Sequence, residues 1–342
     1  LVGIPTFNNS RFGYTIRRTL EALAGQSFRG FRVLIVYKPS PGDRTLDIVD
    51  EFRDKLDIEV KIQSEGFIEE AMNMIFEVAR DYDLLLTTDD DAIPSKTWVE
   101  DHVNFHRQFN DVFIARGLIN RQKLIEQEYG GIVREYPLFK PIRILLSYYK
   151  PLMKDFSDYT VYINIMGLEI FNINFKFTPN LKIIKTFPLG VNMSIKVNVL
   201  GDFKLLGYTL RGLGYEPLLV LHGVIHGFHS VMFEGAYVEH LDRDALSRPK
   251  TPKGLFMRYV ESMIFPYAVH KLLTSESTSI DIDLRRLKTY HNLVRVYSKF
   301  RKTIIARAYE TGLRLAIEAI ENNYEPREVR SRLIDLSKSI NT

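Results

Sequence analysis

Three consecutive carboxylates, Asp89 to Asp91, follow an apolar run at residues 84–86 and are the strongest candidates for chemistry in this sequence. Adjacent like charges are costly unless a cation, basic groups or water compensate them. Hard cations such as Mg²⁺ prefer oxygen ligands and often bind one or two protein carboxylates together with substrate phosphates. The triplet therefore predicts a divalent-metal site for a phosphorylated substrate, and the alternative is a solvated acidic turn.

A second group of candidate ligands lies more than a hundred positions later. Residues 222–229 contain His222, His226 and His229, flanked by glycines and apolar residues. A neutral imidazole binds divalent ions, so His222 and His226 are candidate metal ligands. The alternative for each is a buried histidine that bonds to the backbone. We expect a strand at residues 218–221, directly before them.

The first third of the chain alternates between the patterns of buried strands and amphipathic helices. Strands are predicted at 1–4, 31–37, 58–62 and 84–88, and helices at 14–24, 45–55 and 69–80. Helices between successive buried strands imply parallel pairing with right-handed crossovers. Ligands of such α/β sheets bind at the carboxyl ends of the strands, where the acidic triplet would lie.

Composition narrows the class of protein. The chain has 342 residues, 45% hydrophobic, which permits about two domains. A net charge of +4 and a pI near 8.9 are too weakly basic for a dedicated nucleic-acid binder, so we expect no nucleic-acid partner. The absence of cysteine excludes disulfides, thiolate ligands and a cysteine nucleophile. No segment reaches the roughly 18 apolar residues of a membrane span, and the chain opens without a leader. We therefore expect a cytoplasmic location, with the inner face of the membrane as an alternative.

Five short motifs follow one another in a fixed order along the first hundred residues. They are Gly-Ile-Pro-Thr-Phe-Asn-Asn at 3–9, Leu-Glu-Ala-Leu at 20–23, Gln-Ser-Phe at 26–28, Val-Leu-Ile-Val at 33–36 and Leu-Leu-Thr-Thr-Asp-Asp-Asp-Ala-Ile-Pro at 85–94. Together they resemble the nucleotide-binding half of a family 2 glycosyltransferase with the Rossmann-like GT-A fold. The resemblance implies sugar transfer from a nucleotide diphosphate sugar, with Asp89 and Asp91 as an Asp-x-Asp motif that holds Mg²⁺ or Mn²⁺ against the diphosphate.

The resemblance also implies donor contacts outside the metal motif. The turn of Pro5, Thr6 and Asn8 would contact the nucleotide, and Asp90 would bond a ribose hydroxyl or point back to the sheet. Where relatives often have Ala-Arg-Asn, residues 71–73 read Ala-Met-Asn, which keeps Asn73 as a donor contact and loses a basic one.

The loop after the second strand departs from the family pattern. Relatives usually carry an acidic stretch there, whereas residues 37–43 read Tyr-Lys-Pro-Ser-Pro-Gly-Asp. Tyr37 would stack on a base and Lys38 would meet phosphate, and the alternative is that both are ordinary loop residues. The resemblance therefore leaves the nucleobase open.

A second likeness covers residues 187–215. Residues 187–196 are similar to the family's Gly-x-Asn-Met stretch on the acceptor side, and residues 201–215 resemble a helix that starts with Glu-Asp. Of that acidic pair only Asp202 is present. Asp202 is the candidate general base, because a carboxylate at a helix start can accept the proton of the acceptor hydroxyl and give inversion. The alternative is a helix N-cap.

The remaining segments point to the acceptor side and to a helical extension. Residues 171–178 alternate apolar and polar before a turn at 179–180, which predicts an inserted β-hairpin with residues 181–184 that either lines an acceptor groove or forms a half-buried sheet face. From residue 254 the pattern is helical, and residues 284–302 carry seven basic and no acidic side chains. This stretch is either a membrane-surface element or part of a helical subdomain or homodimer contact with a solvated basic face.

These patterns combine into one architecture. We predict a mostly parallel GT-A sheet flanked by helices, made of a nucleotide-sugar-binding half at 1–120 and an acceptor-side half with the insertion at 121–232, followed by a helical extension at 233–342. The predicted activity is metal-dependent, inverting transfer of a hexosyl group to a glycan or polyprenyl phosphate. A nucleotidyltransferase and a non-catalytic sugar- or lipid-binding protein are the alternatives.

Overall fold

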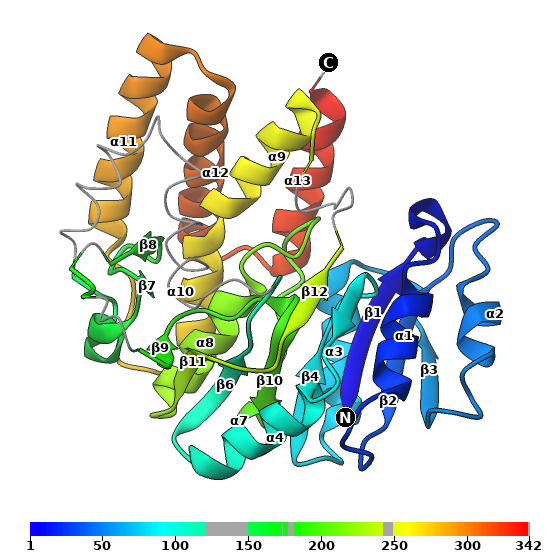
Figure 1. Ribbon diagram of the computed structural model, residues 1–342. Helices are drawn as coiled ribbons and strands as arrows, with labels where there is room; N and C mark the ends of the chain where they lie inside the picture. The colour runs from blue at the N-terminus through cyan, green and yellow to red at the C-terminus, as the bar shows by residue number, and fades with distance from the viewer. Residues whose placement is uncertain (121–149, 173, 177–180, 242–248, 341–342) are drawn as a thin grey trace. The chain divides into compact units, whose positions relative to one another are not determined.

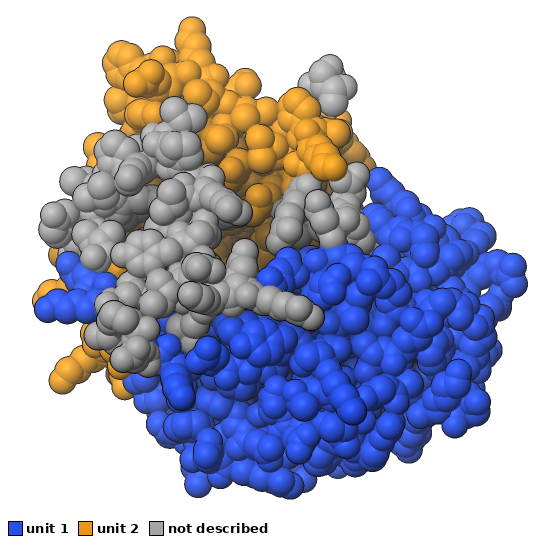
Figure 2. Space-filling view, in the orientation of Figure 1, with its two compact units in different colours: residues 1–140, 174–205, 222–243 blue, residues 141–173, 206–221, 244–342 orange. Residues whose placement is uncertain are grey.

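The computed structural model describes residues 1–120, 150–172, 174–176, 181–241 and 249–340. The chain divides into two compact units (Figure 2). Unit 1 contains Leu1–Lys140, Asn174–Leu205 and His222–Arg243, and unit 2 contains Pro141–Ile173, Leu206–Leu221 and Asp244–Thr342. The units interleave along the chain, so they do not correspond one to one with the consecutive segments 1–120, 121–232 and 233–342.

The described residues of unit 1 form an eight-stranded sheet in the order β3-β2-β1-β4-β10-β6-β11-β9 (Figure 1). Its strands are β1 (Val2–Phe7), β2 (Val33–Lys38), β3 (Ile58–Ile62), β4 (Leu84–Thr87), β6 (Val112–Arg116), β9 (Ile183–Lys185), β10 (Met193–Lys196) and β11 (His229–Phe233). Strands β1, β2, β3 and β4 pair in parallel, as do β6 and β11. Strand β10 is antiparallel to both β4 and β6, and β9 is antiparallel to β11. The predicted mostly parallel α/β sheet is therefore confirmed.

Buried apolar strands alternate with amphipathic helices in unit 1. The helices are α1 (Ile16–Ala24), α2 (Thr45–Asp50), α3 (Ile68–Ala79), α4 (Trp98–Gln108) and the one-turn α7 (Val197–Leu200). The α3 residues Met72, Ile75 and Phe76 recur at helical spacing and are buried. A Cβ on Gly3 would lie 2.5 Å from the Ile75 side chain, so glycine in β1 allows α3 to pack closely on the sheet.

The strand directions give the sheet two different ends, across the strands, which we call the C-terminal edge and the N-terminal edge. Phe7, Lys38, Thr87 and Arg116 end the parallel strands, so they define its C-terminal edge. A separate two-stranded sheet of β5 (Ala92–Pro94) and β12 (Val238–His240) follows directly from this edge in the chain. The parallel strands begin at the opposite, N-terminal edge.

Unit 2 is mainly helical, as the sequence predicted for the C-terminal region. Its helices are α9 (Pro252–Met263), α10 (Phe265–Ser275), α11 (Leu284–Arg301), α12 (Ile304–Glu321) and α13 (Pro326–Ser339). Thr251, Asp283 and Thr303 cap the first turns of α9, α11 and α12, since each side chain accepts a bond from a backbone N–H. None of the described helices combines the length and the apolar composition needed to cross a bilayer.

The inserted hairpin forms from strands other than those predicted. In unit 2, β7 (Val161–Ile163) pairs antiparallel with β8 (Glu169–Phe171). In unit 1, β9 (Ile183–Lys185) joins the large sheet beside β11. Among the described residues the expected pairing of 171–178 with 181–184 is not found, because Phe171 ends β8 and residues 183–185 pair with β11; residues 173 and 177–180 lie outside the described residues. Residues 121–149 of the predicted acceptor-side half, 121–232, also lie outside them.

Two local predictions in the segment 201–221 are wrong. The helix expected from Asp202 is not present, because α7 ends at Leu200 and α8 spans Tyr215–Ile225. Gly201, Gly212 and Gly214 all have positive φ, which a continuous helix does not permit. Residues 218–221 are helical rather than extended, since a short run of buried apolar residues suits either structure.

Candidate metal and donor site

The acidic triplet lies at the C-terminal edge of the sheet, directly after β4. There the structure brings Asp89, Asp91 and His240 together, with one ligand atom of each within 4.8 Å of the others. His240 Nε2 lies 3.4 Å from Asp91 Oδ1 and 3.8 Å from Asp89 Oδ2. The Asp91 side chain is buried, whereas that of Asp89 is 42% exposed. Two carboxylates and an imidazole form a donor set that fits Mg²⁺ or Mn²⁺, with Asp89 on the open side.

His240 is the ligand candidate that the sequence analysis missed. Strand β12 places it, because His240 is paired with Ala92, directly after Asp91. The Leu241 N–H donates to the Asp91 carbonyl at 3.0 Å, a distance typical of backbone hydrogen bonds between strands. The His240 N–H donates to Asn120 Oδ1 at 2.8 Å. A histidine at the end of a short strand-like segment was the only sequence signal, and its partner strand lies about 150 positions earlier in the chain.

Asp90 points back to the sheet rather than into the cluster of ligands. It is buried, and its carboxylate accepts bonds from the Thr6 hydroxyl and from Asn9 Nδ2, the latter at 2.7 Å. Asn9 Oδ1 in turn accepts the Ile16 N–H at the start of α1. Asp90 therefore ties the acidic loop to the end of β1, and the Thr6 hydroxyl is engaged in this contact.

At this edge the Lys38 ammonium lies close to the aromatic rings of Phe7 and Phe67. Lys38 Nζ lies 5.7 Å from the ring centroid of Phe7 and 5.3 Å from that of Phe67, and it donates to the Gly66 carbonyl. Phe7 ends β1 and is 45% exposed, whereas Tyr37 is buried. The exposed ring available for stacking is thus Phe7, and the expectation that Tyr37 stacks on a base is not supported.

The other residues predicted to contact the donor form contacts within the protein. Pro5 lies within β1. The backbone of Asn8 is left-handed, and its side-chain Oδ1 accepts a hydrogen bond from the Ser10 hydroxyl at 3.0 Å. Asn73 bonds both main-chain groups of Leu205, at 2.8 and 3.0 Å. Asn73 therefore fastens α3 to the segment after α7.

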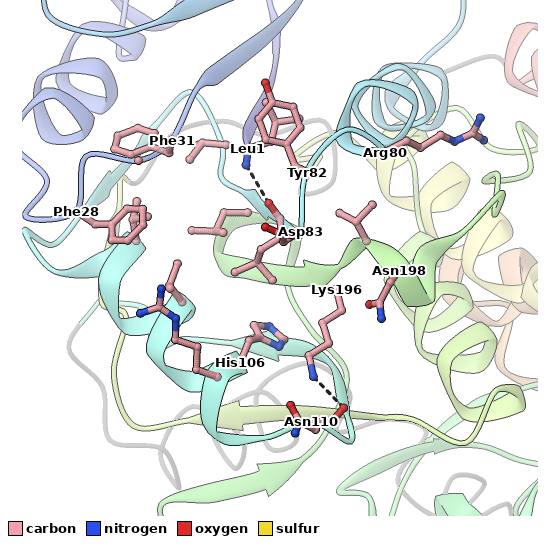
Figure 3. Close-up of a pocket in the computed structure, with 18 of the residues that line it drawn as sticks. Leu1, Phe28, Phe31, Arg80, Tyr82, Asp83, His106, Asn110, Lys196 and Asn198 are labelled. Atoms are coloured by element: carbon pink, nitrogen blue, oxygen red, sulfur yellow. Dashed lines mark hydrogen bonds between the residues drawn. The ribbon is translucent and has the colours of Figure 1, made fainter.

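Asp202 does not lie with the acidic cluster. Its side chain is 96% exposed and forms an ion pair with Arg80 at 3.0 Å. It lines a pocket of about 1030 Å³ together with Leu1, Asp83 and Lys196, at the N-terminal edge of the strands (Figure 3). All of β4 separates this edge from the acidic triplet, so the structure does not place Asp202 where a base for the same reaction would be needed.

His222 and His226 also lie away from the acidic cluster. His222 lies in the last turn of α8 and His226 directly follows the helix, before β11 begins at the N-terminal edge of the sheet. His222 is buried, with Nε2 3.0 Å from the Val199 carbonyl and its ring 4.7 Å from that of Phe203. The hydrogen bond of His222 to the backbone fits the alternative left open by the sequence, and the imidazole that lies beside Asp89 and Asp91 is that of His240.

A buried network of polar side chains supports residues 236–240, the segment that carries His240 and that we call the His240 arm. Asn192 Oδ1 accepts the Trp98 indole N–H at 2.8 Å and faces His102 Nε2 at 3.1 Å. Asn192 Nδ2 donates to the carbonyls of Leu118 at 3.0 Å and Ala236 at 2.7 Å. Ala236 has a φ of 46°, and its N–H donates to Asp101 Oδ2 at 3.0 Å. Both main-chain groups of this left-handed residue are thus fixed just before β12 begins.

The network continues through two neutral histidines. Ser194 Oγ lies 2.8 Å from His102 Nδ1 and 2.9 Å from His106 Nε2. Because His102 Nε2–H donates to Asn192, its Nδ1 accepts from the Ser194 hydroxyl, which fixes the neutral tautomer. Burial lowers the pKa of His102 to about 4, and burial together with the nearby His102 and Lys196 lowers the pKa of His106 to about 3.

These two histidines predict a loss of stability in mild acid. Their folded-state pKa values lie below the unfolded value near 6.5, so the unfolded chain binds more protons and stability falls as the pH drops below about 6.5. Between pH 7 and 5 we expect each histidine to cost about 2 kcal/mol of unfolding free energy. Urea unfolding at both pH values measures this, and His106→Asn should remove about half of the difference. Equal stability at both values in the wild-type protein would contradict the prediction.

Fold and site together define an α/β protein with carboxylates and an imidazole clustered at the C-terminal edge of a mostly parallel sheet. Residues 1–164 match the family model described as glycosyl transferase family 2. This match, over just under half of the chain, agrees with the family that the motifs predicted, and the protein is a glycosyltransferase. Among curated proteins, no sequence matches the chain.

Three solved structures illustrate the likeness of the fold. One is S. aureus TarS 1–349 in complex with UDP-GlcNAc, with 15% identity, a TM-score of 0.49, and coverage of 94% of this chain and 91% of that one. Another is the mannosyltransferase PcManGT of Pyrobaculum calidifontis in complex with GDP-Man and Mn²⁺, with 13% identity, a TM-score of 0.47 and coverage of 94% and 86%. The third is glucosyl-3-phosphoglycerate synthase of Mycobacterium tuberculosis with Mn²⁺, UDP and phosphoglyceric acid, with 13% identity, a TM-score of 0.49 and coverage of 79% and 77%. Likenesses this distant carry no conclusion about the donor, the acceptor or the metal of this protein.

Proposed function

We propose that this glycosyltransferase uses a nucleoside diphosphate sugar as donor and holds its diphosphate through Mg²⁺ or Mn²⁺ at Asp89, Asp91 and His240. The observation that carries the proposal is the convergence of these three side chains at the C-terminal edge of the sheet. A divalent ion bound there would neutralise the negative charge that develops on the departing diphosphate. The protein supplies a buried carboxylate, Asp91, an open one, Asp89, and an imidazole fixed by β12.

The edge beside these ligands suits the nucleoside. Phe7 offers an exposed ring for base stacking, and Lys38 brings a positive charge next to that ring. The Lys38 ammonium also neutralises part of the charge of a bound diphosphate. Asp90 holds the loop between these groups and the metal ligands through Thr6 and Asn9.

The stereochemistry of the transfer and the acceptor form a second part of the proposed function. We propose that a hexosyl group is transferred with inversion to a glycan hydroxyl or a polyprenyl phosphate. Attack by a glycan hydroxyl on the face of the sugar opposite the diphosphate needs a base that takes up the hydroxyl proton, whereas an ionised phosphate acceptor needs none. The position of Asp202 at the N-terminal edge of the sheet leaves that base unassigned. Determination of the anomeric configuration of the product by NMR tests inversion.

Isothermal titration with UDP- and GDP-hexoses, each with and without Mn²⁺, tests the donor site. Binding that requires the metal supports the proposal, and metal-independent binding of the donor contradicts its metal part. A donor screen that detects the released nucleoside diphosphate then identifies the sugar and the base.

Replacement of the imidazole gives a sharper test. We expect His240→Ala to weaken metal-dependent donor binding about tenfold or more, because one of three ligands is lost. His270→Ala is the matched control, since the His270 side chain in α10 is about as exposed as that of His240, at 22% against 20%. Equal losses in both variants would contradict the assignment of His240.

A further inference from the structure

Helix α11 has two apolar faces. Leu287, Tyr290 and Val294 are buried and form its inner face. Helices α11 and α12 run side by side within unit 2 (Figure 1). On the outer side Leu293, Val296 and Phe300 are 54%, 51% and 83% exposed. Their spacing of three and four residues places them in one stripe along the helix, which we call the outer stripe.

Basic side chains border the outer stripe on both sides. At 3.6 residues per turn, Arg285 and Lys299 lie next to Val296 on one side. Arg286 lies next to Leu293 on the other side, and Arg301 ends the helix directly after Phe300. Residues 284–302 contain no acidic residue. Within the described part of the chain, Arg285, Lys299 and Arg301 take part in no ion pair, so their charge is available to a partner.

This combination of charges and apolar groups selects one kind of partner. An apolar stripe between rows of positive charge fits an anionic lipid surface, where the apolar groups enter the headgroup boundary and the cations meet lipid phosphates. A nucleic acid would pair with the charges but leave three large apolar side chains in water. A symmetric contact between two copies would bring the same basic rows against each other, because an isologous interface repeats one surface.

We propose that α11 binds an anionic membrane surface through the outer stripe of Leu293, Val296 and Phe300 and its basic borders. The helix needs no membrane in order to fold, because its inner face is already buried and Asp283 caps its first turn. Binding therefore costs little ordering of the backbone. The proposal does not depend on the donor chemistry, so the tests of donor binding and of vesicle binding have independent outcomes.

Cosedimentation of the full chain with vesicles tests this surface. We expect binding to vesicles of equal parts phosphatidylcholine and phosphatidylglycerol, and little binding to vesicles of phosphatidylcholine alone. About 1 M NaCl, where the Debye length falls to about 3 Å, should weaken the binding strongly. Absence of binding to the anionic vesicles, or equal binding to both kinds, would overturn the proposal.

Paired variants separate the roles of the charges and the stripe. Arg285→Gln/Lys299→Gln should weaken binding about 25-fold, at about fivefold for each charge. Lys55→Gln/Lys338→Gln removes the same charge from exposed sites elsewhere and should change binding less than about twofold. Phe300→Ser should weaken binding about tenfold or more, whereas Ile62→Ser, at a side chain that is 50% exposed in β3, should not.

The oligomeric state distinguishes a second copy from a lipid surface. If light scattering shows a dimer that Phe300→Ser converts to a monomer, and vesicle binding is absent, then a second copy covers the outer stripe and the lipid assignment is wrong. The lipid assignment is supported if Phe300→Ser loses vesicle binding while the mass of the protein in solution stays the same as in the wild type.

Discussion

Replacement of Asp91 by asparagine is expected to lower kcat/KM for sugar transfer by about 10³-fold. Asp91 is buried and lies beside His240 and Asp89, so its charge would fix the cation that stabilises the departing diphosphate. Such stabilisation is worth several kcal/mol in the transition state. Asparagine keeps the size of the side chain but removes its charge, so the effect on folding should be small. The measurement is release of nucleoside diphosphate from the best donor of a UDP- and GDP-hexose screen.

Asp202→Asn is the matched control for this prediction. It makes the same chemical change at a carboxylate that is 96% exposed and paired with Arg80 at the opposite edge of the sheet. We expect transfer within about twofold of wild type, since exposed ion pairs contribute little. If Asp202→Asn instead abolishes transfer while donor binding persists, the base assignment made from the sequence is correct. If Asp91→Asn keeps full activity, the metal site proposed here is wrong.

The largest effect on stability is expected for Asn192→Leu, at about 4 kcal/mol of unfolding free energy. Leucine has a similar size but neither accepts from Trp98 and His102 nor donates to Leu118 and Ala236. Several buried polar groups would then lose a partner at once, at roughly 1 to 3 kcal/mol each, with partial relaxation. Urea unfolding at neutral pH measures the change.

Asn198→Leu provides the control for the same substitution at an exposed site, and we expect a change within about 0.5 kcal/mol. Asn192→Leu should also weaken metal-dependent donor binding, because the Ala236 carbonyl before β12 would no longer be fixed. A stable Asn192→Leu variant with normal donor binding would show that the network does not support the His240 arm.

The sequence predicted the first part of the fold well. Strands β1 to β4 and helices α1 and α3 were expected within a few residues, because fully buried apolar runs and amphipathic helices give strong local patterns. The position of the acidic triplet followed from this order, since β4 ends where the carboxylates begin. The partner of 171–178 was predicted wrongly, because strand pairing is decided by contacts that a local pattern does not contain.

The structure separates site residues that the sequence had suggested would lie together. His222 and His226 were selected as ligands because they cluster in the sequence, and Asp202 because it matched a family motif. Helix α8 and the short α7 carry these residues to the N-terminal edge of the sheet. The imidazole that does lie beside Asp91 belongs to β12, which the sequence analysis did not single out. Its position depends on pairing with β5 and on the bonds of Asn192 and Asp101 around Ala236.

Local patterns in the chain were enough to predict a mostly parallel α/β sheet with carboxylates at a strand end, followed by helices with one strongly basic segment. Burial periodicity and adjacent charges are local properties, so they can be read along the chain. The three-dimensional structure was needed to show which imidazole lies beside the carboxylates, that Asp202 lies at the other edge, and that an exposed apolar stripe accompanies the basic charges of α11. These features depend on strand direction and on which helix face packs inward, and both are set by contacts between segments distant in the chain.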